Sequence, residues 1–191
     1  MVTVLPFRVS SLVAGAASVG VGGSRVGGFA SLGAGVGLVS VVAAAGSAVF
    51  VSCGAGVPAL VRAAFPAASV FSASSFQGLG RGAFAARARA LVVALSAAPS
   101  PLWVCFPVSA CPAAAATVGP RGLGRSWVSC GSGSWSECRL AAGLGVPVLV
   151  FLPAGVVPPG AWGSWLSVGW SAGGQWYWLP AGGGVGLFGL G

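Results

Sequence analysis

The chain lacks several amino acids on which catalytic and metal sites depend. It has 191 residues and contains no Asp, Asn, His, Ile or Lys, and Glu137 is its single acidic residue. Without His and Asp, Ser/His/Asp and Cys/His catalysis are excluded. The five cysteines show neither the C-x-x-C spacing of a zinc site nor an even count. We therefore expect no metal and no cofactor, and free thiols in a reducing, cytoplasmic compartment.

The composition reflects the coding strand rather than the fold. Nearly every residue is Gly, Ala, Val, Leu, Ser, Pro, Phe, Trp, Cys or Arg, the types that codons without adenine can encode. The net charge of +8 thus records a shortage of acids rather than a basic patch, although its sign favours the approach of an anionic ligand or nucleic acid. A translated non-coding frame is an alternative, and it predicts no ordered succession of motifs.

A membrane span is not expected, although one stretch is apolar enough. No charge lies between Arg25 and Arg62, and Leu32–Val51 has the length of a spanning helix. Its pattern changes midway, however, from small residues to the β-branched and aromatic run Ala48–Val51. That change favours a helix, a glycine stop and a strand. A signal peptide is not expected either, because only Arg8 precedes the apolar stretch.

Strand-like and helix-like runs alternate through the middle of the chain. We expect strands at Ser18–Gly22, Ala48–Ser52, Ser69–Phe71, Leu102–Phe106 and Pro147–Phe151; helices at Phe29–Ala45, Pro58–Ala64, Ala83–Ala97 and Leu140–Leu144; and loops at Ser72–Arg81 and Pro107–Cys130. Apolar strands joined by helices predict an α/β fold, a Rossmann-like parallel sheet with helices on both faces. Right-handed crossovers then gather the strand-to-helix turns at one edge, where such folds bind ligands.

The chain divides into three parts by composition. Residues 1–17 form an N-terminal extension, 18–153 the Rossmann-like domain, and 154–191 a tail rich in Trp and Gly. We expect an irregular tail whose tryptophans cover apolar surface on the domain or on a second copy in a homodimer: Trp162, Trp165, Trp170, Trp176 and Trp178. A stacking platform for nucleic-acid bases is less favoured, because no arginine is interleaved among these rings.

The glycine-rich stretch Ser129–Arg139 is the strongest candidate for a binding site. A glycine-rich loop that opens a helix leaves backbone N–H groups unpaired at the positive end of the helix dipole, which suits a phosphate. The candidate ligands of that anion are the N–H groups of Gly131, Ser132 and Gly133 and the hydroxyl of Ser134. Glu137, one helical turn further along, is expected at the rim of this anion-binding seat. The alternative is a connecting turn in which Glu137 is a favourable first-turn acid.

Arginines from two other segments are candidates for the same site. Arg25 follows a strand within the turn that contains Gly23 and Ser24, and its planar fork suits a phosphate; a solvated surface arginine is the alternative. Arg87 and Arg89 are two positions apart on a helix, so at most one of them faces a ligand. We favour Arg87.

Several of these segments, in this order, resemble motifs of one family. The similar segments are Val19–Arg25, Val51–Val57, Phe84–Arg89, Gly133–Glu137 and Gly145–Val148. In the same order, they resemble five features of the SLOG superfamily. These are the G-S-R motif of the first strand, the second turn, the F-P-x-R-N-R helix start of the DNA-processing branch, the G-T-x-x-E end of the lonely-guy motif, and the connection from the helix to the last strand. This Rossmann-like group joins DNA-processing proteins of the DprA type to the lonely-guy cytokinin-activating enzymes.

The resemblance implies a nucleotide or nucleotide-derived ligand, with Gly54 and Gly56 of the second turn in the site. Binding or sensing is favoured over turnover, because only one carboxylate exists for acid–base work. The alternatives are N-glycosidic hydrolysis of a nucleoside phosphate, with Glu137 as the catalytic residue, and DNA binding as in the DNA-processing branch. The chain departs from the family where Pro58 replaces an Asp and where Cys130–Ser132 replaces P-G-G.

Overall fold

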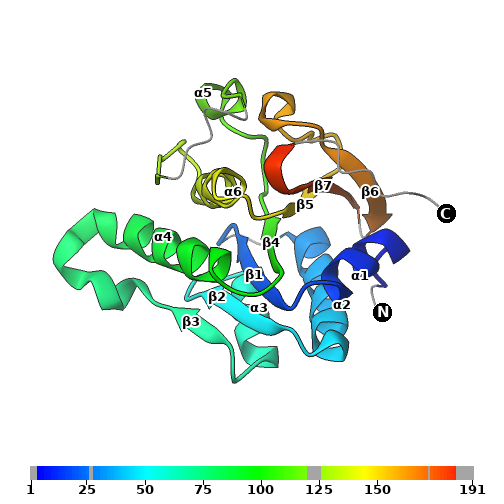
Figure 1. The fold of residues 1–191 in the computed structure, drawn as a ribbon, viewed down its shortest axis with the longest axis horizontal. Helices are drawn as coiled ribbons and strands as arrows, with labels where there is room; N and C mark the ends of the chain where they lie inside the picture. Colours follow the sequence, from blue (N-terminus) through cyan, green and yellow to red (C-terminus); the bar gives the residue numbers. More distant parts are fainter. Residues whose placement is uncertain (1–3, 26–27, 120–125, 172, 184–191) are drawn as a thin grey trace.

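The computed structural model describes residues 4–25, 28–119, 126–171 and 173–183, and it confirms the α/β fold (Figure 1). Seven strands form one sheet in the order β3-β2-β1-β4-β5-β7-β6. Strands β1 to β5 are parallel to one another, and β7 pairs antiparallel with both β5 and β6. The strands are β1 (Ser18–Gly23), β2 (Ala48–Ser52), β3 (Ser69–Phe71), β4 (Pro101–Phe106), β5 (Val148–Pro153), β6 (Leu166–Ser171) and β7 (Gly174–Leu179).

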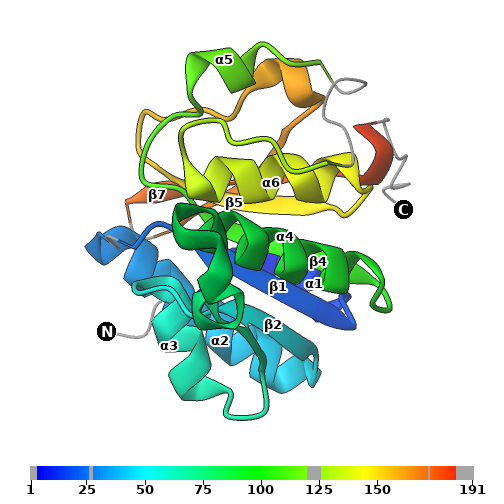
Figure 2. The ribbon, with the colours of Figure 1, turned by 90° about the vertical axis from the view of Figure 1, so that its left-hand side faces the viewer.

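Helices cover both faces of the sheet, as the sequence predicted. Helices α1 (Phe7–Ala14), α2 (Phe29–Ala45) and α3 (Val57–Ala64) share a core with one face. On the other face lie α4 (Ala83–Ser96), α5 (Ala113–Ala116) and α6 (Gly133–Gly143). Figure 2 shows α4 and α6 side by side in front of the central strands. Three 3-10 segments complete the described structure: η1 (Ala73–Gly82), η3 (Gly160–Trp162) and η4 (Ala181–Gly183).

The two central strands are buried on both faces, as expected for interior strands. Along β1 the residues alternate between valine and glycine. Val19 and Val21 belong to the core under α2, whereas a side chain at Gly20 would collide with Leu95 of α4 and with Trp103 of β4. The glycines of β1 therefore leave room for the Trp103 indole, which is fully buried.

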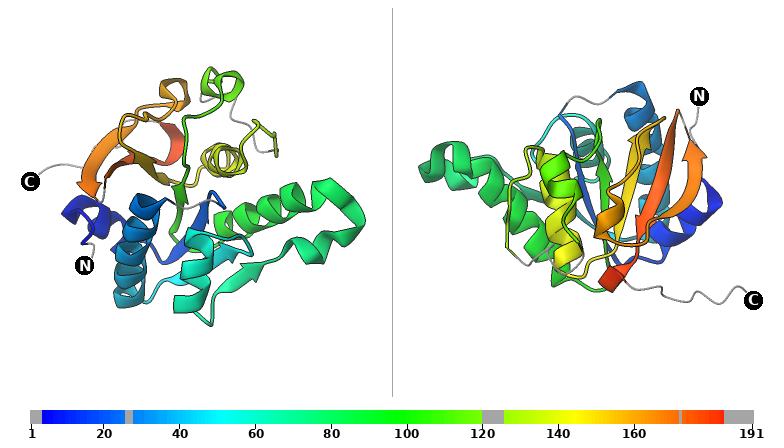
Figure 3. Two further views of the ribbon diagram at one scale, coloured as in Figure 1. Left: turned by 180° about the vertical axis from the view of Figure 1, so that it is seen from behind. Right: turned by 90° about the horizontal axis from the view of Figure 1, so that it is seen from above.

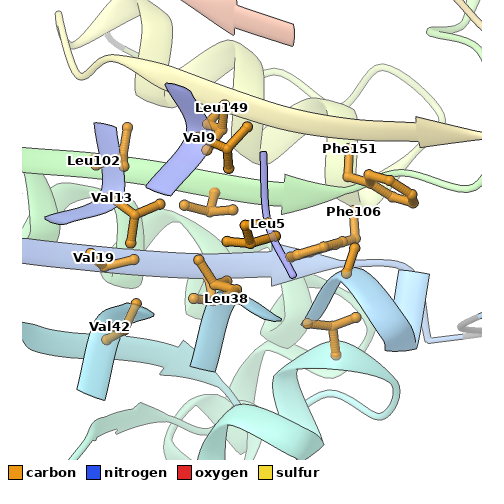
Figure 4. Packing of buried hydrophobic residues seen from close by; sticks show 14 of the residues in the cluster. Leu5, Val9, Val13, Val19, Leu38, Val42, Leu102, Phe106, Leu149 and Phe151 are labelled. Carbon is orange, nitrogen blue, oxygen red and sulfur yellow. The ribbon is translucent and has the colours of Figure 1, made fainter. Parts of the chain in front are cut away.

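Residues before β1 contribute to the first core. Leu5, Val9 and Val13 pack among side chains of α2 and of the central strands, and Figure 4 shows them beside Leu38 and Leu149. Val9 and Val13 have no exposed surface. The N-terminal segment thus closes the face of the sheet that α2 leaves partly uncovered.

The apolar stretch after Arg25 is a helix followed by a strand, as predicted. Helix α2 ends at Ala45, and Gly46 adopts a left-handed conformation with φ of 67°. The N–H of Gly46 donates to the carbonyls of Val42 (3.1 Å) and Ala43 (3.3 Å). A glycine in this conformation commonly ends a helix. In the part of the chain that the structure describes, no helix has both the length and the apolar character needed to cross a bilayer.

Three local predictions were wrong. Most of the expected loop Ser72–Arg81 belongs to η1, and the expected loop Pro107–Cys130 contains α5. Helix α6 begins at Gly133, well before the expected start at Leu140. Glycine and serine have weak helix propensity, but Trp135 and Cys138 of this segment are fully buried against the sheet, and such packing overrides propensity.

The described part of the tail is more regular than we expected. Strands β6 and β7 form a hairpin, and β7 pairs with β5 at the end of the sheet (Figure 3). Burial along β7 alternates as in a strand, because Trp176 and Trp178 are buried while Gln175 and Tyr177, the residues that precede them, are partly exposed. Trp176 and Trp178 of β7 therefore cover the domain itself, which is one of the two arrangements that we expected, whereas Trp170 of β6 is exposed.

Candidate functional site

A cavity of about 410 Å³ opens at the carboxyl ends of β1, β2 and β4, beside the first turn of α6. The strand order reverses between β1 and β4, and open α/β sheets bind ligands outside such a switch point. The N–H of Ser24 donates to the carbonyl of Phe106 (3.1 Å), which holds the ends of the two strands together. The lining residues are Gly23, Ser24, Arg25, Ser52, Gly54, Phe84, Arg87, Ala88, Val108, Trp127, Ser132, Gly133, Ser134 and Glu137.

The first turn of α6 forms one wall of the cavity. Ser132 is the N-cap residue and makes no side-chain capping hydrogen bond. The turn is held instead by Ser136, whose hydroxyl donates to the Ser132 carbonyl (2.7 Å) and accepts from the N–H of Cys130 (3.0 Å). The N–H groups of the first turn have no intrahelical acceptors, and a Cβ at Gly133 would meet nothing within 4 Å. The turn thus has the chemistry of an anion seat.

A buried ion pair lies in the cavity wall. Nη2 of Arg87 on α4 is 3.3 Å from Oε1 of Glu137 on α6. Arg87 is 9% exposed and Glu137 is 4% exposed. Nη1 of Arg87 donates to Sγ of Cys53 (3.8 Å), whereas its buried Nε has no hydrogen-bond partner among the described residues. The guanidinium is therefore only partly satisfied by the protein.

Glu137 does not lie at the rim, where we expected it, and it is not a first-turn acid. Because α6 begins at Gly133, Glu137 falls in the second turn, and its carboxylate points at the sheet over Gly22. Burial raises its pKa to about 7, although the charge and hydrogen bond of Arg87 act in the opposite direction. A carboxyl group with such a pKa exchanges protons near neutral pH.

The other candidate arginine lies at the exposed side of the cavity. Cζ of Arg25 is 4.3 Å from the centroid of the Phe84 ring, and Cζ of Arg87 is 5.9 Å from the same ring. Arg25 is exposed. Arg89 is also exposed and does not line the cavity. Of the two arginines on α4, only Arg87 faces the cavity.

Helix α3 holds the carboxyl end of β2 through Arg62. Nη1 of Arg62 donates to the carbonyls of Ser52 and Gly54, the latter at 2.8 Å. Sγ of the adjacent Cys53 accepts from the N–H of Ala73 (3.4 Å). Burial alone would raise the pKa of the Cys53 thiol, but the hydrogen bond from Ala73 and the hydrogen bond and charge of Arg87 outweigh burial and lower it.

Most of the predicted site residues meet in this cavity. Those that line it are Gly23, Ser24, Arg25, Gly54, Arg87, Ser132, Gly133, Ser134 and Glu137. Gly56 and Gly131 do not line it. Gly56 is the N-cap of α3 with φ of 70°, and Gly131 has φ of 83°, so both glycines turn the chain.

The sequence analysis did not identify every lining residue. Ser52, Phe84, Ala88, Val108 and Trp127 also line the cavity. Phe84 and Ala88 could have been predicted, because Phe84 lies three positions before Arg87 and four before Ala88, and residues at these spacings are neighbours on a helix. Val108 and Trp127 come from the long connection between β4 and α6, where no periodic pattern marks a direction.

No family model, curated protein or solved structure matches this chain. The resemblance to the SLOG superfamily and the identity of a ligand therefore stay predictions. Within the described residues, no three Cys or Glu side chains lie close enough together to hold a metal ion.

Proposed function

We propose that the cavity binds a nucleotide or a nucleotide-derived ligand. One observation carries this proposal: an uncapped first turn of a helix, two arginines and two aromatic side chains line one cavity at the switch point of the sheet. The arginines are Arg25 and Arg87, and the aromatic residues are Phe84 and Trp127. The volume of the cavity falls within the range of about 300 to 1,000 Å³ that is typical of small-molecule sites.

The phosphate end of such a ligand matches the α6 side of the cavity. Amide N–H groups of Gly133 and Ser134 and the positive end of the helix dipole attract a phosphate, and Arg25 adds a charge at the open side. A base has a π face, which stacks on aromatic side chains such as Trp127 or Phe84. Phosphate and base are thus accommodated by different walls.

N-glycosidic hydrolysis is a second candidate, and the pKa of Glu137 favours it. Hydrolysis of AMP adds water across the bond between ribose C1′ and the base nitrogen, and releases adenine and ribose 5-phosphate. A carboxyl group with a pKa of about 7 is suited to donate the proton to the leaving base. Release of free base by the wild type, abolished in Glu137→Gln, would support turnover. If the wild type leaves AMP intact, binding without hydrolysis is the function that is supported.

A thermal-shift screen against a nucleotide panel tests the proposed function. At a hundredfold excess over the dissociation constant, a ligand stabilises the folded protein by about 2.7 kcal/mol. That free energy raises the melting temperature of a domain of this size by several degrees. A panel of nucleoside mono- and diphosphates that leaves the melting temperature unchanged would contradict the proposal.

A further inference from the structure

We propose that Glu137 competes with the phosphate of the ligand for Arg87, so that the site takes up a proton when the phosphate binds. This inference rests on the proposed function and concerns the same cavity. It assigns Glu137 the role of a built-in counter-ion, which holds Arg87 in the free protein and gives it up to the ligand.

The contacts of Arg87 leave room for a second anion. A guanidinium has five N–H donors, and a strong carboxylate pair uses two of them in a parallel fork. Here the pair with Glu137 is a single contact of 3.3 Å, and Nη1 meets only the weak acceptor Sγ of Cys53. Nε has no hydrogen-bond partner in the residues that the structure describes, although Arg87 as a whole is nine-tenths buried. A phosphate oxygen would supply the acceptor that Nε of Arg87 lacks among the described residues.

The phosphate seat and the carboxylate belong to one helix. Ser132, Gly133 and Ser134 line the cavity from the first turn of α6, and Glu137 lines it from the next turn. A phosphate on the amide groups therefore brings negative charge into the cavity that the buried carboxylate of Glu137 lines. A second negative charge in the cavity disfavours the ionised carboxylate and raises its pKa, so that Glu137 takes up a proton.

Within the part of the chain that the structure describes, no other group near Glu137 offers a better place for that proton. Arg87 of α4 faces it, and β1 presents Gly22, which has no side chain. The pKa of Cys105 on β4 is raised by burial, by Cys138 and by the charge of Glu137. Cys138 and Arg139 are its neighbours on α6, and Arg25 lies in the cavity after β1. Glu137 is the only acidic side chain of the protein. The free site is largely a carboxylate above pH 7, so the uptake is expected there.

Calorimetry with AMP tests the inference in the wild-type protein. At pH 8.5 the phosphate of AMP is already a dianion, because its second pKa is about 6. Titrations in two buffers of different ionisation enthalpy should give an uptake of close to one proton, and the dissociation constant should rise up to about tenfold per pH unit above neutrality. A dissociation constant independent of pH, with no proton uptake, would overturn the inference.

Four variants test which group takes up the proton and which arginine binds the phosphate. Glu137→Gln should bind AMP at pH 8.5 more tightly than the wild type, with no uptake and no pH dependence. Cys53→Ser should retain the uptake, and its loss in that variant would move the proton to the thiol and overturn the inference. Arg87→Ala should lose AMP binding at every pH, whereas the exposed Arg89→Ala should not.

The two proposals fail in different ways. Absence of binding by AMP and by the rest of the panel at pH 6.5, where Glu137 is already largely protonated, would overturn the proposed function and this inference with it. Binding of AMP without proton uptake would overturn this inference alone.

Discussion

The carboxylate of Glu137 lies directly over the Cα of Gly22. A Cβ built at Gly22 would be 2.5 Å from Oε2 of Glu137 and would also collide with the ring of Trp103. The glycine in the first strand is thus required by a side chain of a helix more than a hundred residues later in the chain. It is the absence of a side chain at Gly22 that lets the one acid of the protein approach the sheet beside Arg87.

Gly22→Ala should therefore destabilise the protein and displace Glu137. Overpacking of a tight core costs about 1 to 3 kcal/mol, and here the methyl group meets a carboxylate and a fully buried indole. Chemical denaturation measures the change in the free energy of unfolding. Gly78→Ala is the control, because a Cβ there has no neighbour within 4 Å. Equal stability of the two variants would show that Gly22 does not hold the carboxylate in place.

The buried carboxyl group should make stability depend on pH. Burial raises the pKa of Glu137 from an ordinary 4.5 to about 7, so the folded protein binds the proton more tightly than the unfolded chain. The corresponding stability is complete below pH 4.5 and is lost as the pH rises to 7, by on the order of 3 kcal/mol. The melting temperature of the wild type should fall over this window relative to Glu137→Gln. Parallel profiles of the two proteins would contradict a raised pKa.

Cys53 should be the first cysteine to react with iodoacetamide. The thiolate is the reactive form, and hydrogen bonds from Ala73 and Arg87 favour it at Cys53, whereas burial raises the pKa of Cys111 to about 12. Both thiols are partly exposed, so Cys111 is the matched comparison. Mass spectrometry of a time course at pH 7.5 measures the order of labelling. Labelling of Cys111 at an equal rate would show that Arg87 and Ala73 do not activate Cys53.

The two tryptophans Trp162 and Trp170 should differ sharply in their effect on stability. Trp162 has no exposed surface, packs edge-on against Trp135 of α6 at 5.8 Å between ring centroids, and donates to the carbonyl of Ala115 (2.9 Å). Trp162→Ala should cost about 3 to 5 kcal/mol. Trp170 is 61% exposed, and Trp170→Ala should change the free energy of unfolding by less than about 0.5 kcal/mol. Similar values for the two variants would contradict the docking of the tail on α6.

Elements with a strong local signal were predictable from the sequence. Helix α2 has its predicted bounds, because a glycine stop separates it from the β-branched run of β2. Helix α6 was predicted too short, because Gly133 and Ser134 have turn propensity and only the contacts of Trp135 with distant residues, such as Ser109 and Trp162, show why they are helical. The hairpin of the tail likewise depends on β5, a partner that local patterns do not reveal.

The candidate site was predictable in its residues but not in its geometry. Residues that follow strands or open helices, such as Arg25, Gly54 and Gly133, meet at one edge because the topology of a parallel sheet brings them there. The pairing of Arg87 with Glu137 was not predictable, since it depends on the angle at which α4 packs beside α6 and on the space above Gly22. The turning roles of Gly56 and Gly131 depend on backbone conformation, which glycine content alone does not specify.

Gly133→Val tests the central claim, that the first turn of α6 seats the phosphate of a nucleotide. Gly133 lines the cavity, and the space around a new Cβ is open there, so the variant should fold while its side chain blocks the amide groups. Gly160→Val is the control, because Gly160 opens η3 in equally open space and does not line the cavity. The measurement is the rise in melting temperature that the best nucleotide of the panel produces. We predict a rise of several degrees in the wild type and in Gly160→Val, a smaller one in Arg25→Ala and none in Gly133→Val. An undiminished rise in Gly133→Val would show that the phosphate is not bound by α6.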